Sequence, residues 1–173
     1  LLGPEMKSTG EVMGIDREFG LAFAKSQIAT GLRLPLSGTV FISVKDEDKP
    51  RTLEVARGFL ELGYDLLATR GTASYLKERG LRATPVNKVK EGSPHVVEAL
   101  NGGQAHFVIN TVFGEVAIRD SFSLRRASLN QNLPYCTTMA GAAALLRAMQ
   151  AIKFNELDVT SLQEYAADRL PSQ

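Results

Sequence analysis

Short apolar runs alternate along most of the chain with longer segments in which apolar residues recur at helical spacing. A short apolar run bounded by turn residues is typical of a strand buried on both faces of a parallel sheet. Strands that alternate with helices predict a parallel sheet covered by helices on both faces. The expected strands are 39–44, 64–68, 82–87, 105–110 and 134–137, and the expected helices are 49–62, 72–79, 94–101, about 116–128, 139–152 and 160–169.

The first part of the chain follows a different pattern. Residues 1–15 show no clear period, and a helix of roughly fifteen residues, capped by Asp16, is then expected. Glycine and proline mark residues 31–38 as a linker. We therefore expect two parts: residues 1–33, which form a short helical segment and linker, and residues 34–173, which form an α/β domain.

The composition narrows the class of protein. At 173 residues the chain fits one domain with an appendage. Its 20 basic and 19 acidic residues give a net charge of +1, so charge offers no argument for binding nucleic acid or a membrane surface. The single cysteine, Cys136, cannot form an internal disulfide, and no signal peptide or membrane-length apolar run is visible, so we expect a cytoplasmic protein. The chain begins with Leu1 rather than methionine, and we expect a piece of a longer protein.

Hydroxyl, amide and ammonium groups follow four of the predicted strands. They are Ser43 and Lys49 after the first strand, Thr69 and Thr72 after the second, Lys88 after the third, and Asn110 and Thr111 at the end of the fourth. In an open parallel sheet, ligands bind beyond the carboxyl ends of the strands, so these groups gather where a phosphorylated ligand would bind. No cluster of acids, bases or metal ligands accompanies them, and the pattern therefore indicates binding more than catalysis.

Each of these groups also has a structural interpretation. Gly71 lets the backbone approach a ligand, and the free N–H groups at the start of the next helix favour an anion. Thr69 and Thr72 could equally act only as helix caps, and the two lysines could be solvated surface charges. Asn110 and Thr111 could contact a ribose or a base, or satisfy the backbone of their own turn. The residues alone leave these alternatives open.

Residues that often carry catalysis do not gather in this sequence. His95 and His106 stand apart, with no metal-ligand spacing, and we expect structural roles for both. Cys136 lacks a surrounding motif and is expected to be a small core residue. Neither a GxGxxG after a strand nor a Walker sequence occurs. We therefore expect no catalytic residues, no metal site and no cofactor within residues 1–173.

Two parts of the sequence resemble one protein family. The opening run from Pro4 to Gly14, PEMKSTGEVMG, resembles the end of the second ATP-grasp unit in the large subunit of carbamoyl phosphate synthetase. The rest resembles the C-terminal allosteric domain of that subunit, which has a methylglyoxal-synthase-like fold. The strings that carry this resemblance are ATRGT at 68–72, VNKV at 86–89, EG at 91–92, PH at 94–95, INT at 109–111 and YCTT at 135–138.

This resemblance implies a fold, ligands and residue roles. The fold would be a three-layer α/β/α arrangement with a five-stranded parallel sheet, preceded by the tail of the synthetase unit in residues 1–33. The ligands would be the nucleotides UMP, an inhibitor in related enzymes, and IMP, an activator. By position, the phosphate-binding residues are Ser43, Lys49, Thr69, Thr72 and Lys88, the ribose- and base-binding residues are Asn110 and Thr111, and an ornithine site contains Tyr135 and Thr137. Three residues depart from the family pattern, namely Arg70, Val112 and Cys136.

The resemblance further implies regulation rather than catalysis in residues 1–173. The parent would be an ATP-dependent ligase, using ATP and a divalent metal to make carbamoyl phosphate from bicarbonate and glutamine for pyrimidine and arginine biosynthesis. The implied partners are a nucleoside monophosphate, the rest of the large subunit, the small glutaminase subunit and a second copy in a homo-oligomer, with no nucleic acid and no membrane. Two alternatives stay open: a stand-alone lyase related to methylglyoxal synthase, and a structural oligomerisation domain. Residues 90–94 lack the aspartate of the lyase's Gly-Gly-Asp segment, which favours regulation.

Overall fold

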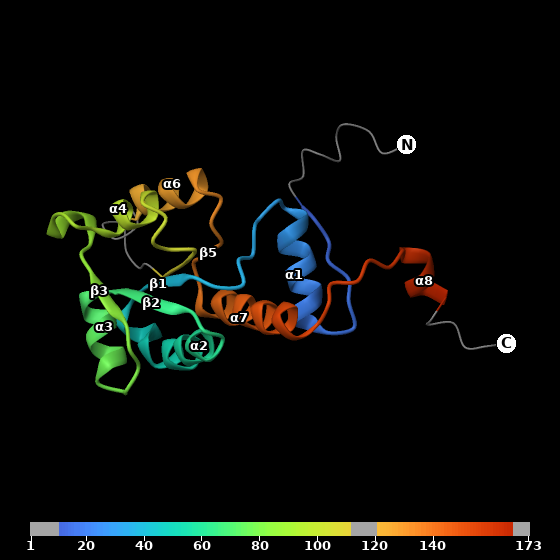
Figure 1. Ribbon diagram of the computed structural model, residues 1–173, viewed down its shortest axis with the longest axis horizontal. Coiled ribbons are helices and arrows are strands. Elements are labelled where there is room, and N and C mark those ends of the chain that lie inside the picture. Colours follow the sequence, from blue (N-terminus) through green and yellow to red (C-terminus); the bar gives the residue numbers. More distant parts are fainter. Residues whose placement is uncertain (1–10, 112–120, 168–173) are drawn as a thin grey trace.

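Five parallel strands form the centre of the molecule. The computed structural model describes residues 11–111 and 121–167, and its sheet has the strand order β3-β2-β1-β4-β5 (Figure 1). The strands are β1 (Thr39–Val44), β2 (Asp65–Thr69), β3 (Thr84–Val86), β4 (Phe107–Thr111) and β5 (Tyr135–Cys136). The helices are α1 (Phe19–Ala29), α2 (Lys49–Glu61), α3 (Arg70–Lys77), α4 (Val96–Asn101), α6 (Phe122–Asn130), α7 (Met139–Phe154) and α8 (Leu162–Ala167), with short 3-10 helices η2 (Asp46–Asp48) and η3 (Val89–Glu91).

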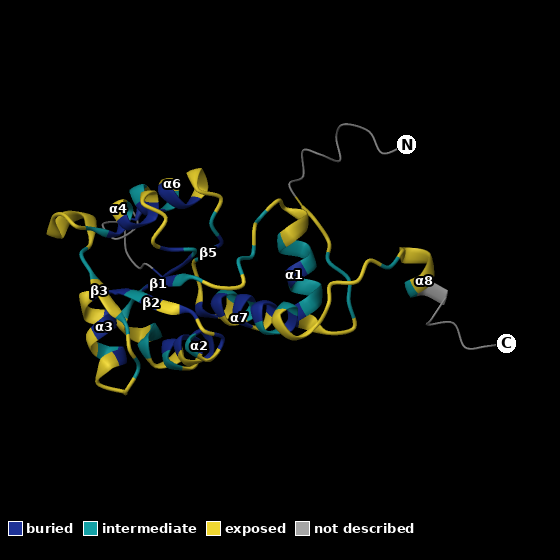
Figure 2. Cartoon of the chain, in the orientation of Figure 1, coloured by how far each residue is buried: buried dark blue, intermediate teal, exposed yellow. Residues whose placement is uncertain are grey.

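Helices cover both faces of the sheet. Successive residues of β1 point to opposite faces, so Val40 and Ile42 pack with α2, α3 and α7, whereas Phe41 packs with α4 and α6. Phe59 of α2 and Phe107 of β4 are fully buried in the first of these two clusters. Figure 2 shows buried residues within the layered part and mainly exposed residues on α8. The three-layer α/β/α fold with a five-stranded parallel sheet is therefore confirmed.

Ordinary strand and helix signals explain several element boundaries. Pro50 lies in the first turn of α2, where its missing N–H is not needed. Gly63, with φ +88°, follows the end of that helix in a conformation that favours glycine. The strand expected at 82–87 is shorter in the structure, because β3 lies at the edge of the sheet and Pro85 cannot donate a hydrogen bond to a neighbouring strand.

Other helices begin at different residues from those expected. α3 begins at Arg70, two residues early, because β2 leads into it without an intervening turn. α4 begins after His95, whose side chain accepts a hydrogen bond from the backbone N–H of Glu98. The helices expected at about 116–128 and at 160–169 fall partly outside the described residues, and α6 and α8 are their described counterparts.

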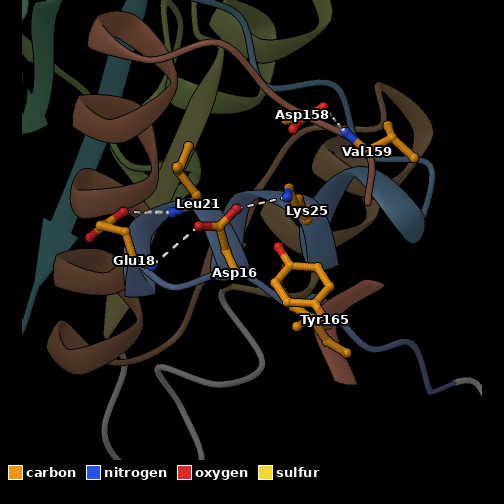
Figure 3. Close-up of polar contacts among 8 residues, drawn as sticks. Asp16, Glu18, Leu21, Lys25, Asp158, Val159 and Tyr165 are labelled. Carbon is orange, nitrogen blue, oxygen red and sulfur yellow. Dashed lines mark hydrogen bonds and ion pairs between the residues drawn. The ribbon is translucent and has the colours of Figure 1, made fainter. Parts of the chain in front are cut away.

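The expected Asp16 cap of the first helix is wrong, because Glu18 caps α1. The Glu18 carboxylate accepts a hydrogen bond from the backbone N–H of Leu21 at 2.8 Å (Figure 3). Asp16 lies two residues further from the helix, and its carboxylate accepts from the Glu18 N–H at 3.2 Å and from the Lys25 ammonium at 2.7 Å. The hydrogen bond from Lys25 holds the pKa of Asp16 below its usual value. Tyr165 of α8 lies beside Lys25 and adds to this group of contacts (Figure 3).

The helix α1 packs along α7 and so joins the layered part of the structure. Gly20 is buried where the two helices meet, since a Cβ there would stand 2.6 Å from the carbonyl oxygen of Arg147. In the linker, the carbonyl of Pro35 accepts a hydrogen bond from the Tyr64 hydroxyl at 2.6 Å. The division of the chain at residue 33 stays a prediction. In the described part of the chain, no helix is long and apolar enough to cross a membrane.

Candidate functional site

A pocket of about 460 Å³ lies at the carboxyl edge of the sheet. Four of the residues predicted to bind a ligand line it, namely Ser43, Thr69, Lys88 and Asn110. Ser43 of β1 pairs with Asn110 of β4 in the sheet register, and Thr69 ends the neighbouring strand β2. Lys88 comes from the segment between β3 and η3. The parallel strand ends thus bring these four side chains together, in a volume typical of small-molecule sites, which hold about 300–1,000 Å³.

The pocket has polar and apolar walls. Its other polar lining residues are Lys90, Glu91, Ser121 and Ser123, and its apolar lining residues are Phe41, Val89, Val96, Phe122 and Leu124. Phe41, Val96 and Leu124 belong to the core cluster under α4 and α6. An apolar wall beside hydroxyl and ammonium groups suits a ligand with both a charged group and a flat apolar part.

Thr69 and Thr72 form a buried pair at the start of α3. Their Oγ1 atoms are 3.2 Å apart, with the Thr69 hydroxyl donating, and the two residues are 5% and 2% exposed. Thr69 occupies the capping position of α3, but its side chain makes no capping hydrogen bond. A hydroxyl can both donate and accept, so the pair retains one proton that it can donate to a ligand oxygen. The interpretation of Thr69 as a simple helix cap is therefore not supported.

Lys49 lies beside the start of α3 but outside the pocket lining. Its Nζ atom is 3.9 Å from the place where a Cβ on Gly71 would stand, and it forms an ion pair of 2.6 Å with Asp46 of η2. The hydrogen bond and charge of Lys49 lower the pKa of Asp46, and the charge of Lys88 contributes to the same effect. Lys49 thus pairs with Asp46, and the charge of Lys88 acts on the same carboxylate.

Asn110 and Thr111 have different surroundings. The Asn110 side chain is 1% exposed and donates a hydrogen bond of 2.7 Å to the hydroxyl of Tyr135, and it lines the pocket. The Thr111 hydroxyl accepts from the backbone N–H of Lys45 at 3.3 Å, which holds the chain where β1 ends. Of the two residues predicted to face the ribose and base, the structure thus brings Asn110 into the pocket and engages Thr111 with the backbone.

The two residues predicted for ornithine lie on either side of Cys136. Tyr135 joins the pocket through its hydrogen bond to Asn110, whereas Thr137 is exposed between β5 and α7. Burial raises the pKa of the Cys136 thiol to about 11, so this thiol is protonated at neutral pH. Cys136 packs against the core cluster, in keeping with the expected structural role.

Sequence reasoning missed the contribution of α6 and η3 to the pocket. Ser121, Phe122 and Leu124 come from the start of α6, well beyond Thr111 at the end of the preceding strand β4, so they gave no strand-end signal. Glu91 accepts a hydrogen bond from the backbone N–H of Lys88 at 2.9 Å and so fixes the loop that carries this lysine. A Glu three residues after Lys88 was the available sign of such a turn.

Among the described residues, no group of three or more His, Cys, Asp or Glu side chains could hold a metal ion. His106 Nδ1 accepts a hydrogen bond from the backbone N–H of Thr39 at 3.0 Å, and His95 caps α4. Both histidines therefore have the structural roles expected of them. The fold and the pocket together define a class: three-layer α/β domains with a small-molecule pocket beyond the carboxyl ends of parallel strands.

Comparison with known proteins identifies the family within this class. The family model of the MGS-like domain matches residues 51–137, about half of the chain, and the chain belongs to this family. The carbamoyl phosphate synthase large chain of Rhizobium meliloti (strain 1021) is 54% identical over 165 residues, which are 95% of this chain and 14% of that protein. The large chain, C-terminal section, of Aquifex aeolicus (strain VF5) is 51% identical over 169 residues, or 95% of this chain and 32% of that protein. The resemblance inferred from the sequence is thus confirmed, and the chain spans less than a third of the length of either relative.

A solved structure supports the fold independently. The methylglyoxal synthase of Elizabethkingia anophelis NUHP1 superposes with a TM-score of 0.52 at 16% sequence identity, over 81% of this chain and 97% of that one. At this identity the similarity concerns the fold alone.

Proposed function

We propose that this chain is the regulatory domain of a glutamine-dependent carbamoyl phosphate synthase and that its pocket binds a nucleoside monophosphate effector. One observation carries the proposal: Ser43, Thr69, Lys88 and Asn110, each chosen from the sequence as an effector contact, line a single pocket. The high identity to carbamoyl phosphate synthase large chains supports the assignment of the parent.

The lining residues suggest how a nucleotide would be held. The phosphate binds at the start of α3, where the remaining hydroxyl proton of the Thr69–Thr72 pair, the first backbone N–H groups of the helix and the ammonium of Lys88 donate hydrogen bonds. Lys49 breaks its ion pair with Asp46 and binds the phosphate instead. Ser43 adds a further hydroxyl for the phosphate, Asn110 contacts the ribose, and the base lies on the apolar wall that contains Val96 and Leu124. Thr111 supports Asn110 through the backbone.

The domain would regulate a distant active site. The parent is an ATP-dependent ligase that makes carbamoyl phosphate in the cytoplasm for pyrimidine and arginine biosynthesis, and ATP and a divalent metal bind elsewhere in it. Its partners are the rest of the large chain and the small glutaminase subunit. Effector binding favours one conformation of the whole enzyme, with a coupling free energy of about 1–3 kcal/mol. Ornithine acts at a site that contains Tyr135 and Thr137.

The proposal is tested by titrating UMP and IMP into the 173-residue chain while its melting temperature is measured. Ligand at about 100 times its Kd adds roughly 2.7 kcal/mol to stability, and for this size of domain about 2–4 °C follow from each kcal/mol. We therefore expect a rise of about 5–11 °C. Lys88→Ala should weaken binding about tenfold to a hundredfold, because it removes a charge-assisted contact to phosphate.

Lys77→Ala is the matched control, since Lys77 is an exposed lysine at the far end of α3. It should bind the nucleotides like the unchanged chain. A flat melting temperature across millimolar UMP and IMP, in chain shown to be folded, would refute the proposal. Equal binding by the Lys88→Ala and Lys77→Ala variants would place any nucleotide site elsewhere. In the complete enzyme, a Lys88→Ala variant that changes assembly but not effector response would favour the structural alternative.

A further inference from the structure

Phe122 is the most exposed apolar residue of the pocket wall, ahead of Val89, which is 36% exposed. It is the first residue of α6 and is 67% exposed, whereas the three core residues of the same wall, Phe41, Val96 and Leu124, are at most 5% exposed. The helix buries Leu124 against the sheet and leaves the Phe122 ring at the mouth of the pocket. When a ligand enters, an exposed apolar side chain at the rim of a pocket can bury more surface than a side chain that is already part of the core.

The chemistry of the pocket selects the part of a ligand that this ring would meet. The ammonium of Lys88 and the hydroxyl of Thr69 suit an anionic group, so an apolar group of the same ligand must lie toward Val96, Leu124 and Phe122. An aromatic ring favours offset stacking on another flat π-system over contact with a ribose or phosphate. A heteroaromatic base fits both the apolar wall and the open face of the ring.

We propose that Phe122 stacks on the base of the bound nucleotide and covers the open side of the pocket. This inference rests on the proposed function, since it names the residue that recognises the base in the same site. The sequence alone does not point to Phe122, because this residue lies at the start of a helix and not at the end of a strand. The structure places it in the pocket lining.

The test compares ligands with and without a base. IMP, UMP and ribose 5-phosphate are titrated calorimetrically into the unchanged chain and into the Phe122→Ala variant. Stacking on an aromatic side chain predicts a Kd for IMP about fivefold to a hundredfold weaker in the variant. A smaller loss is expected for UMP, whose single ring offers less stacking surface, and no loss for ribose 5-phosphate, which has no base.

Two further variants sharpen the comparison. Leu129→Ala removes another exposed apolar side chain of α6, 80% exposed and outside the pocket lining, and should leave all three affinities unchanged. Phe122→Trp preserves an aromatic face and introduces the only tryptophan of the chain, since the sequence has none. Its fluorescence should change on adding IMP or UMP and stay constant on adding ribose 5-phosphate.

Each outcome decides the question. A loss of affinity that is equal for IMP and ribose 5-phosphate would show that Phe122 shapes the pocket without touching the base, and would overturn the inference. Unchanged IMP binding in the Phe122→Ala variant would overturn it as well. A contact with another protein would then be the alternative role of the exposed ring. If the unchanged chain binds none of the three ligands, the proposed function itself is refuted. If the unchanged chain binds all three, the proposed function stands, and the Phe122→Ala result tests the stacking inference alone.

Discussion

The hydrogen bond between Asn110 and Tyr135 joins the pocket to the edge strand β5, and its removal makes a quantitative prediction. The Asn110 amide donates to the Tyr135 hydroxyl at 2.7 Å, and Asn110 is 1% exposed. Tyr135→Phe keeps the ring and deletes only the acceptor. The buried amide then loses its partner at a place where water has little access.

The cost follows from the burial of this amide. A buried polar group left without a partner costs about 1–3 kcal/mol, more than the roughly 0.5–1.5 kcal/mol that a typical hydrogen bond contributes net. We therefore expect Tyr135→Phe to lower the free energy of unfolding by about 1–3 kcal/mol. For a domain of this size, that corresponds to a melting temperature lower by about 2–12 °C. Because Asn110 also lines the pocket, nucleotide affinity should fall by about tenfold as its amide loses its fixed orientation.

Thermal and urea unfolding of four proteins would measure the effect: the unchanged chain, Tyr135→Phe, Asn110→Ala and the double variant. If the two side chains act as a pair, the double variant should lose less stability than the sum of the single losses, by at least about 0.5 kcal/mol. Tyr75→Phe is the control, because it deletes the hydroxyl of a half-buried ring of α3 and keeps that ring against the Arg79 guanidinium, 3.6 Å away. Strictly additive losses, or a Tyr135→Phe variant as stable as the control, would refute the reasoning.

Three further outcomes are expected. Thr72→Val should weaken nucleotide binding about fivefold or more and Thr72→Ser much less, since Ser keeps the hydroxyl paired with Thr69, and equal affinities in calorimetry would show that this hydroxyl is only structural. Asp46→Asn should tighten nucleotide binding by about two- to fivefold, because it frees Lys49 from its ion pair, and an unchanged or weaker affinity would argue against competition at this lysine. The chain should form no methylglyoxal from dihydroxyacetone phosphate, and turnover that disappears in a Thr69→Ala variant would favour the lyase alternative.

The sequence was most informative where local patterns alone determine position. Ser43, Thr69 and Asn110 stand at the carboxyl ends of three adjacent strands, and parallel pairing necessarily brings such ends to one edge. The strands could be located because each is a short apolar run between turn residues. The fold class and these three members of the pocket therefore follow from periodicity and turn chemistry.

Other features depend on contacts that no local pattern encodes. Phe122 enters the pocket through the packing of α6 on the sheet, and the partner of Asn110 comes from Tyr135, 25 residues further along the chain. The cap of α1 was misplaced because Asp16 and Glu18 are both acceptable near a helix start, and only the side-chain geometry separates them. Lys49 was assigned to phosphate with no indication of its ion pair to Asp46.

Several elements at the carboxyl edge of the sheet line the pocket together. Its lining comes from α4 and α6 on one face of the sheet, from η3, and from the ends of β1, β2 and β4. A ligand that contacts all of these gains affinity only in the arrangement that aligns them, and it therefore stabilises that arrangement over others. Through its hydrogen bond to Tyr135, Asn110 links the pocket to β5. Two residues after β5, the hydroxyl of Thr138 caps α7. The helix α7 in turn packs along α1, so β5 and α7 lie between the pocket and α1. The Asn110 and Tyr135 variants remove the first side-chain contact of this series and leave the backbone pairing of β4 with β5 in place.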